Sequence, residues 1–190
     1  MATKTFGTNE TLTSADVNVY LNNGGMVFLA ENSATSGTVI SIDNVFTSAY
    51  DAYRIVISDY RTTAASTSCL LRLRAATVPA ATSYAYGSMT QALYTSTALT
   101  VAGTTTGTSF DLFLRADTIG MGAIIDIINP ALTQWTTITT NGPHGGNTAG
   151  FGLKQVSGIH AQATAYDGFQ LTSAVAFSNI KVRVYGYRQA

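Results

Sequence analysis

The clearest pattern of hydrophobic and polar positions in the chain covers residues 53–60, which contain no Gly or Pro. In a β-strand, Ile55 and Ile57 share one face, whereas Arg54 and Val56 share the other. β-Branched residues favour strands, and this run contains three of them in succession. Because both faces carry apolar atoms, the pattern predicts a strand inside a sheet rather than at its edge.

Four other segments have a similar pattern and complete the set of predicted core strands. They are residues 68–75, 110–115, 122–128 and 180–187. Shorter β-rich runs lie between them, so that about eight to ten strands follow one another with turn residues at intervals. The sequence therefore predicts an all-β fold, an antiparallel β-sandwich that is jelly-roll-like, with no helix after residue 25.

Two stretches rich in turn-forming residues are predicted to lie outside the strands. Residues 102–108 read Ala-Gly-Thr-Thr-Thr-Gly-Thr, which indicates a flexible turn. Residues 141–147 contain Asn, Pro, His and three Gly, which indicates a broad polar loop.

The first 25 residues differ from the rest of the chain. Val17, Tyr20 and Leu21 recur at helical spacing between a capping sequence and the Asn-Asn-Gly-Gly stop. We expect an extended arm containing Phe6, followed by one short helix over residues 14–22. Two or three turns of helix are not stable alone. The predicted organisation is therefore a docking element of residues 1–25 and a sandwich domain of residues 26–190, with Phe6, Val17, Tyr20 and Leu21 as docking side chains.

Composition and charge exclude several classes of protein. The chain of 190 residues is 46% hydrophobic, only 11% charged, and has a formal net charge of zero. A nucleic-acid-binding protein needs an excess of Lys and Arg, and a disordered protein needs low hydrophobicity and high net charge. No run approaches the roughly 18 apolar residues of a membrane span, and the start lacks the apolar centre of a signal peptide. We therefore expect that the protein binds no nucleic acid, does not insert into a membrane and is made in the cytoplasm. The low charge favours self-association.

The residues that most often carry chemistry do not form a recognisable motif. Cys69 is the only cysteine, and its apolar neighbours predict a buried side chain. His144 and His160 belong to no metal-binding or catalytic spacing. We therefore predict no catalytic residue, no cofactor and no metal site.

Asp126 is the carboxylate with the most unusual setting, because it stands in the apolar run of residues 124–128. A carboxylate in such a strand needs a partner, and the sequence offers Arg72, Arg115 or Arg183. We expect a structural ion pair rather than a general acid.

Aromatic residues provide a candidate surface for sugars. Tyr84, Tyr86 and Tyr94 cluster in one irregular segment, and His144 lies in the predicted polar loop. These four residues are the candidates for contact with a glycan of a host surface, although strand tyrosines more often serve in packing.

Three segments together resemble structural proteins of tailed-bacteriophage particles. Residues 5–21 (TFGTNETLTSADVNVYL) are similar to an arm and helix of the form F…G-E-x-L-T-A-x-D-V-N-x-Y-L. Residues 50–56 (YDAYRIV) resemble the strand Y-D-x-Y-R-I-V of the same proteins. Residues 177–188 resemble their closing strand, G-T-I-R-V-Y-G-x-R, and depart from it at Ser178 and Asn179, where a glycine is common.

The resemblance implies a structural component of the virion, in the tail or tail fibre. Because residues 1–25 are too short to fold alone, we expect them to attach the subunit to other virion proteins. A homotrimer is expected by analogy with fibre heads. The resemblance carries no catalytic residues with it. The alternatives are a capsid decoration or cement protein and, from a different class, a glycan-binding module or a polysaccharide-degrading enzyme.

Overall fold

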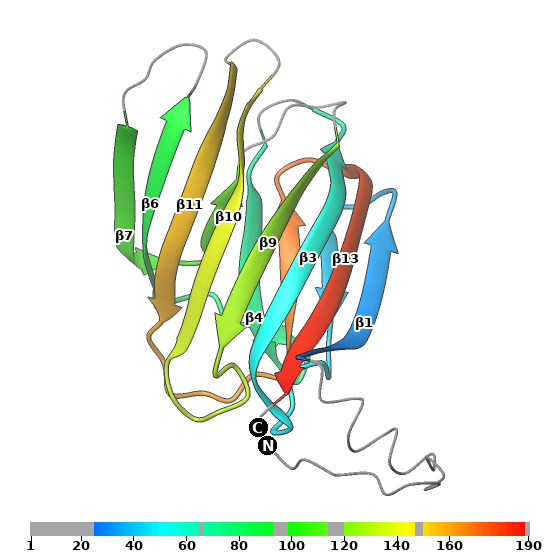
Figure 1. Ribbon diagram of the computed structural model, residues 1–190, viewed down its shortest axis with the longest axis vertical. Coiled ribbons are helices and arrows are strands. Elements are labelled where there is room, and N and C mark those ends of the chain that lie inside the picture. The colour runs from blue at the N-terminus through cyan, green and yellow to red at the C-terminus, as the bar shows by residue number, and fades with distance from the viewer. Residues whose placement is uncertain (1–24, 65–66, 93–98, 114–119, 147–149, 189–190) are drawn as a thin grey trace, which may run out of the picture.

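A computed structural model describes residues 25–64, 67–92, 99–113, 120–146 and 150–188. These residues form two antiparallel β-sheets that pack face to face (Figure 1). The large sheet has eight strands in the order β1-β13-β3-β9-β10-β11-β6-β7. The small sheet has the order β2-β12-β4-β5, and β8 also pairs with β4. The all-β prediction is confirmed for the described residues.

The strands of the large sheet are β1 (Met26–Ala34), β3 (Tyr50–Thr62), β6 (Tyr84–Ala92), β7 (Leu99–Gly107), β9 (Met121–Ile128), β10 (Thr136–Gly146), β11 (Gly150–His160) and β13 (Phe177–Arg188). Those of the small sheet are β2 (Val39–Ile42), β4 (Cys69–Ala75), β5 (Val78–Pro79), β8 (Phe110–Phe113) and β12 (Gly168–Ser173). The five predicted core strands are thus confirmed, as β3, β4, β8, β9 and β13.

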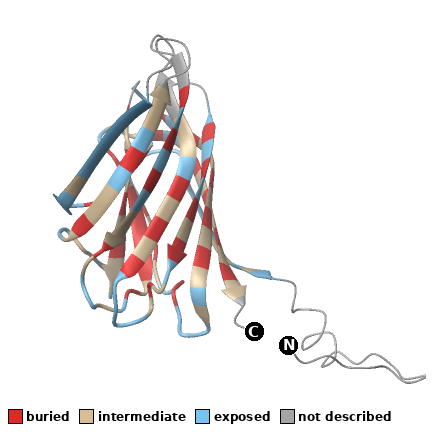
Figure 2. Cartoon of the chain, turned by 60° about the vertical axis from the view of Figure 1, so that its left-hand side comes forward, coloured by how far each residue is buried: buried red, intermediate tan, exposed pale blue. Residues whose placement is uncertain are grey.

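The core lies between the two sheets and is centred on β3, which is flanked by β13 and β9. Tyr53, Ile55 and Ile57 are at most 1% exposed, as the alternation predicts. Buried and partly exposed positions alternate along the strands in Figure 2. Burying one such aliphatic side chain contributes about 1.5–3 kcal/mol, so this face is the main source of stability.

Two predicted loops are strands in the structure. Residues 141–146, predicted as loop, are the second half of β10 and pair with β11 throughout. Residues 102–107, predicted as a turn, belong to β7, where Ala102, Gly103, Thr104 and Gly107 pair with β6. In both cases the local composition does not favour a strand, and the hydrogen bonds to a neighbouring strand hold the segment in the sheet. The first strand, β1, was not predicted, because its sequence MVFLAENSA lacks a regular alternation.

The predicted arm and helix of residues 1–25 lie almost wholly outside the described residues. Phe6, Val17, Tyr20 and Leu21 all belong to that part of the chain. The described residues contain no helix long and apolar enough to cross a membrane.

Candidate functional site: the outer face of the large sheet

The outer face of the large sheet, which is turned away from the small sheet, is organised in rows that cross all eight strands. Strand registers place directly opposite residues on the same face. One row contains, in order, Glu31, Arg183, Val56, Ile124, Asn141, Gln155, Met89 and Val101. The outer face is thus one continuous surface to which every strand of the sheet contributes.

This face is rich in exposed apolar side chains. Twelve large hydrophobic residues are exposed in the described part of the chain. Eight of them lie on the outer face, namely Met26, Phe28, Met89, Leu99, Val101, Ile124, Ile128 and Leu153. Apolar patches of this kind on a soluble protein usually mark an interaction surface.

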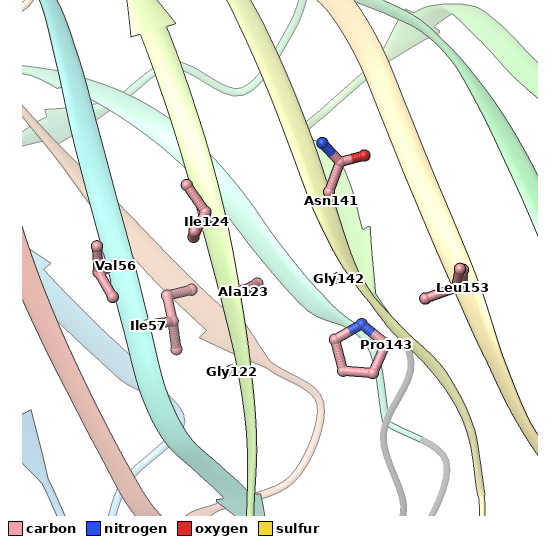
Figure 3. A pocket seen from close by; sticks show the side chains of 9 residues that line it. All are labelled: Val56, Ile57, Gly122, Ala123, Ile124, Asn141, Gly142, Pro143 and Leu153. Atoms are coloured by element: carbon pink, nitrogen blue, oxygen red, sulfur yellow. The ribbon is translucent and has the colours of Figure 1, made fainter.

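A shallow groove of about 530 Å³ is hollowed into the middle of this face (Figure 3). Val56, Ile124, Pro143 and Leu153 border it from β3, β9, β10 and β11. Gly122 of β9 also lines it, at a position where an added Cβ would lie 2.9 Å from the backbone oxygen of Ile57 on β3. A nearly apolar groove of this shape has room for an aliphatic or aromatic side chain.

The ion pairs of this face lie on β1, β13, β3 and β9. Glu31 Oε2 accepts a hydrogen bond of 2.6 Å from Arg183 Nε, and Lys181 Nζ lies 3.1 Å from Glu31 Oε1. Arg183 and then Lys181 lower the pKa of Glu31. These exposed pairs fix the register of β1 on β13 more than they stabilise the fold.

The partner of Asp126 is Arg54, not one of the three arginines suggested by the sequence. The two residues face each other across β3 and β9 and form two hydrogen bonds of 2.7 Å. The carboxylate raises the pKa of the Arg54 guanidinium, which also lies over the Tyr187 ring. Asp126 is partly exposed on the outer face, so the structural ion pair is confirmed while its predicted partners are wrong. The pairing depends on register, which single-strand patterns do not contain.

The residues predicted to contact a host surface are not brought together by the structure. Tyr84 is fully buried, and its hydroxyl accepts a hydrogen bond from Leu73 N and donates one to Ala80 O. It is therefore a core residue and not a surface residue. Tyr86 is half-buried, while Tyr94 and the side chain of His144 lie outside the described residues.

His160 is buried in an aromatic cluster. Its Nε2 lies 3.0 Å from Thr82 O, and its Nδ1 lies 3.0 Å from the Tyr166 hydroxyl. The Tyr84 ring packs against it with centroids 4.4 Å apart. Burial lowers the pKa of His160, so the neutral imidazole is favoured. With both ring nitrogens engaged and no solvent access, this cluster serves packing.

Cys69 and Lys154 are the other buried groups with reactive chemistry. Cys69 is fully buried, as predicted, and burial raises the pKa of its thiol, which disfavours the nucleophilic thiolate. Lys154 Nζ is paired with Asp111 Oδ2 at 2.7 Å between the sheets. Among the described residues, no group of three or more His, Cys, Asp or Glu could hold a metal ion.

Comparison with known proteins gives no match: no family model, no curated protein and no solved structure is detectably similar to this chain. The candidate site therefore rests on its geometry. Sequence reasoning missed the outer face as a site, although one signal for it is present. Residues 124–128 place isoleucines on both faces of β9, which is more than a strand with one solvated face requires.

Proposed function

We propose that this chain is a structural subunit of a tailed-bacteriophage particle, in the tail or its fibres, that acts through protein–protein contacts rather than catalysis. It joins other virion proteins, and copies of itself, through the outer face of the large sheet and the N-terminal arm. The finer topology that we propose for the sandwich is jelly-roll-like.

The observation that carries this proposal is the gathering of eight exposed hydrophobic side chains on one sheet face. Leu153 is 63% exposed and Val101 is 71% exposed, which is costly for a protein that remains free in water. The chain has no net charge to keep copies apart. A subunit that is covered in an assembly explains both features.

The phage assignment itself rests on the three sequence segments at residues 5–21, 50–56 and 177–188. In the structure, the second and third segments lie in neighbouring strands, β3 and β13, which pair along most of their length. The similarity of these two segments to one set of proteins is then a similarity in one packed unit rather than in two separate pieces.

The direct test is to locate the protein on intact particles. Antibodies raised against the purified chain are expected to label the tail or fibres of purified phage in electron micrographs. Labelling spread over the head would support the alternative of a capsid decoration protein. Absence of the protein from purified particles, by labelling and by mass spectrometry, would contradict the proposal.

A second test concerns attachment. Burying the apolar side chains at positions 6, 17, 20 and 21 would contribute about 6–10 kcal/mol before ordering costs. Deleting residues 1–22 is expected to leave a folded sandwich that no longer enters particles. Normal incorporation of the truncated protein, or its failure to fold, would show that the arm is not a docking element.

A glycan-binding module is the second candidate, because the outer face also carries an aromatic group. Phe28 is 55% exposed and packs edge-to-face on Tyr185, with Tyr187 one row away beside the Arg54–Asp126 pair. Aromatic rings next to a hydrogen-bonding ion pair are suited to stacking against a sugar and binding its hydroxyl groups. Binding of host polysaccharide that is lost in Phe28→Ala and unchanged in Trp135→Ala would favour this candidate, and shortening of the polysaccharide would indicate an enzyme.

A further inference from the structure

The β7 edge of the large sheet is open to another strand. Within the described residues β7 pairs only with β6, so the backbone groups along its other side have no strand partner. Between Leu99 and Thr104, every residue but Thr104 is exposed. The stretch contains no charged residue and no Pro, the two features that most often protect an edge.

The opposite edge of the sheet is protected. β1 contains an irregularity between Phe28 and Ala30, and Glu31 adds a charge that is held by Arg183 and Lys181. Asn32 Nδ2 donates a hydrogen bond of 2.9 Å to Ser41 O, which ties β1 to the small sheet. The strands at the ends of the small sheet, β2, β5 and β8, have at most four residues each.

We propose that β7 pairs antiparallel with β7 of a second copy of this chain, about a two-fold axis perpendicular to the sheet. Among the described strands this is the one long edge without charge, so a copy joined through it presents no second edge of the same kind. The pairing therefore closes at two chains and does not continue as a filament. The zero net charge means that two copies do not repel each other.

The side chains select one register. An axis at Val101 places the two copies of this residue, 71% exposed in the single chain, side by side on the outer face. The same register sets Leu99 opposite Gly103 of the other copy. Gly103 carries no side chain, so Leu99 of one copy meets only the backbone of the other copy on each side of the axis. The regular part of β7 ends at Thr104, before the irregularity near Gly107, and the register needs only residues 99–103.

This pairing joins two eight-stranded sheets into one and makes their outer faces continuous. It rests on the strand edge and not on the virion role, so either proposal can fail without the other. A contact of five residues per chain buries well under 1,000 Å², which is typical of weak association. We expect a dissociation constant on the order of 10–100 μM, and a dimer in place of the trimer that the resemblance implies.

A charge exchange at position 101 tests the proposal. Sedimentation of the full chain between about 1 and 200 μM is expected to show monomer and dimer. Val101→Lys and Val101→Glu place like charges opposite each other at the axis and should each weaken the dimer at least about tenfold. An equimolar mixture of the two variants should restore it, because Lys then faces Glu. Val78→Lys is the matched control, since Val78 is 67% exposed on β5 and should leave the dimer unchanged.

Circular dichroism and thermal unfolding of each variant show that the fold is intact, and the mixture recovers association only if both variants are folded. The proposal would be overturned if the wild-type chain were monomeric over the whole concentration range or formed a trimer. It would also be overturned if neither substitution at position 101 weakened the dimer. A mixture that stays monomeric while each variant is folded would overturn it as well. So would a monomer that binds an extended foreign peptide along β7.

Discussion

The two ends of the large sheet are built in opposite ways. At the β1–β13–β3 end, alternate side chains of β13 and β3 are buried against the small sheet, and charged residues pair across the outer face. At the β6–β7 end, the last strand is exposed along most of its length and carries no charge. The first end holds the fold together, whereas the second leaves backbone groups and apolar side chains exposed.

This difference shows that the strands that stabilise the fold and the strand whose edge is exposed for pairing lie at different ends of one sheet. A strand that contributes little to the core can leave its edge exposed without unfolding the protein, since its opening is local and leaves the core strands in place. A central strand such as β3 has no such freedom. The following predictions test this division, beginning with the largest expected effect.

Replacing a side chain at the centre of β3 should cost far more than the same change on β7. Ile55→Ala removes a fully buried side chain and is expected to lower the free energy of unfolding by about 2–5 kcal/mol. Val101→Ala is the matched variant at the exposed end and should change it by no more than about 0.5 kcal/mol. Urea unfolding of the monomer measures both. Equal losses in the two variants would contradict the division.

The sequence predicted the central strands β3, β9 and β13 well and the edge strands β1 and β7 poorly, for a physical reason. β3, β9 and β13 bury one face, and burial imposes an alternation that is visible in a single strand. β7 buries neither face, so its Thr-Gly-rich composition was interpreted as a turn. Whether such a stretch becomes a strand depends on β6 beside it, which is a tertiary contact.

The contacts between strands could not be predicted from the sequence either. The interpretation of Asp126 as half of an ion pair was correct, because a carboxylate among apolar neighbours requires a compensating charge. Its partner Arg54 follows from the register of β3 and β9, which no local pattern specifies. Likewise, Tyr84 looks like a surface residue among small polar neighbours, yet β6 turns it into the core against Phe110 and His160.

The buried ion pair between β8 and β11 should be the most sensitive polar feature of the β6 half. Lys154 is 8% exposed, and Asp111→Asn removes the charge that compensates it. We expect a loss of roughly 2–3 kcal/mol in the free energy of unfolding. The double variant Asp111→Leu, Lys154→Met should recover most of that loss, because an apolar pair needs no compensation. An unchanged stability of Asp111→Asn would mean that water reaches Lys154.

Stability should also depend on pH through His160. Its pKa is lowered on folding, so the unfolded chain binds the proton first as the pH falls. Stability is therefore complete above the unfolded pKa of about 6.5 and is lost as the pH falls toward the folded pKa, with a slope of at most about 1.4 kcal/mol per pH unit. Unfolding between pH 7.5 and 5.5 should show this slope, and His160→Gln should flatten it. The same slope in both proteins would exclude His160 as its source.

The smallest effect is expected for the exposed pair on the outer face. Asp126→Asn keeps the shape of the side chain and removes its charge, and both partners are about one-third exposed. The cost should be at most about 1 kcal/mol. A double-mutant cycle with Arg54→Gln isolates the interaction. A coupling energy of several kcal/mol would show that this end depends on its surface charges more than on its core.

Hydrogen–deuterium exchange of the full chain tests the division of the sheet most directly. At about 1 μM, amides of β3, β9 and β13 should exchange only through global unfolding, while those of β7 should exchange orders of magnitude faster. At about 200 μM, protection should rise in β7 alone, because its free edge is then paired with a second copy. Uniform protection across the sheet, or β7 exchange that does not depend on concentration, would contradict the account.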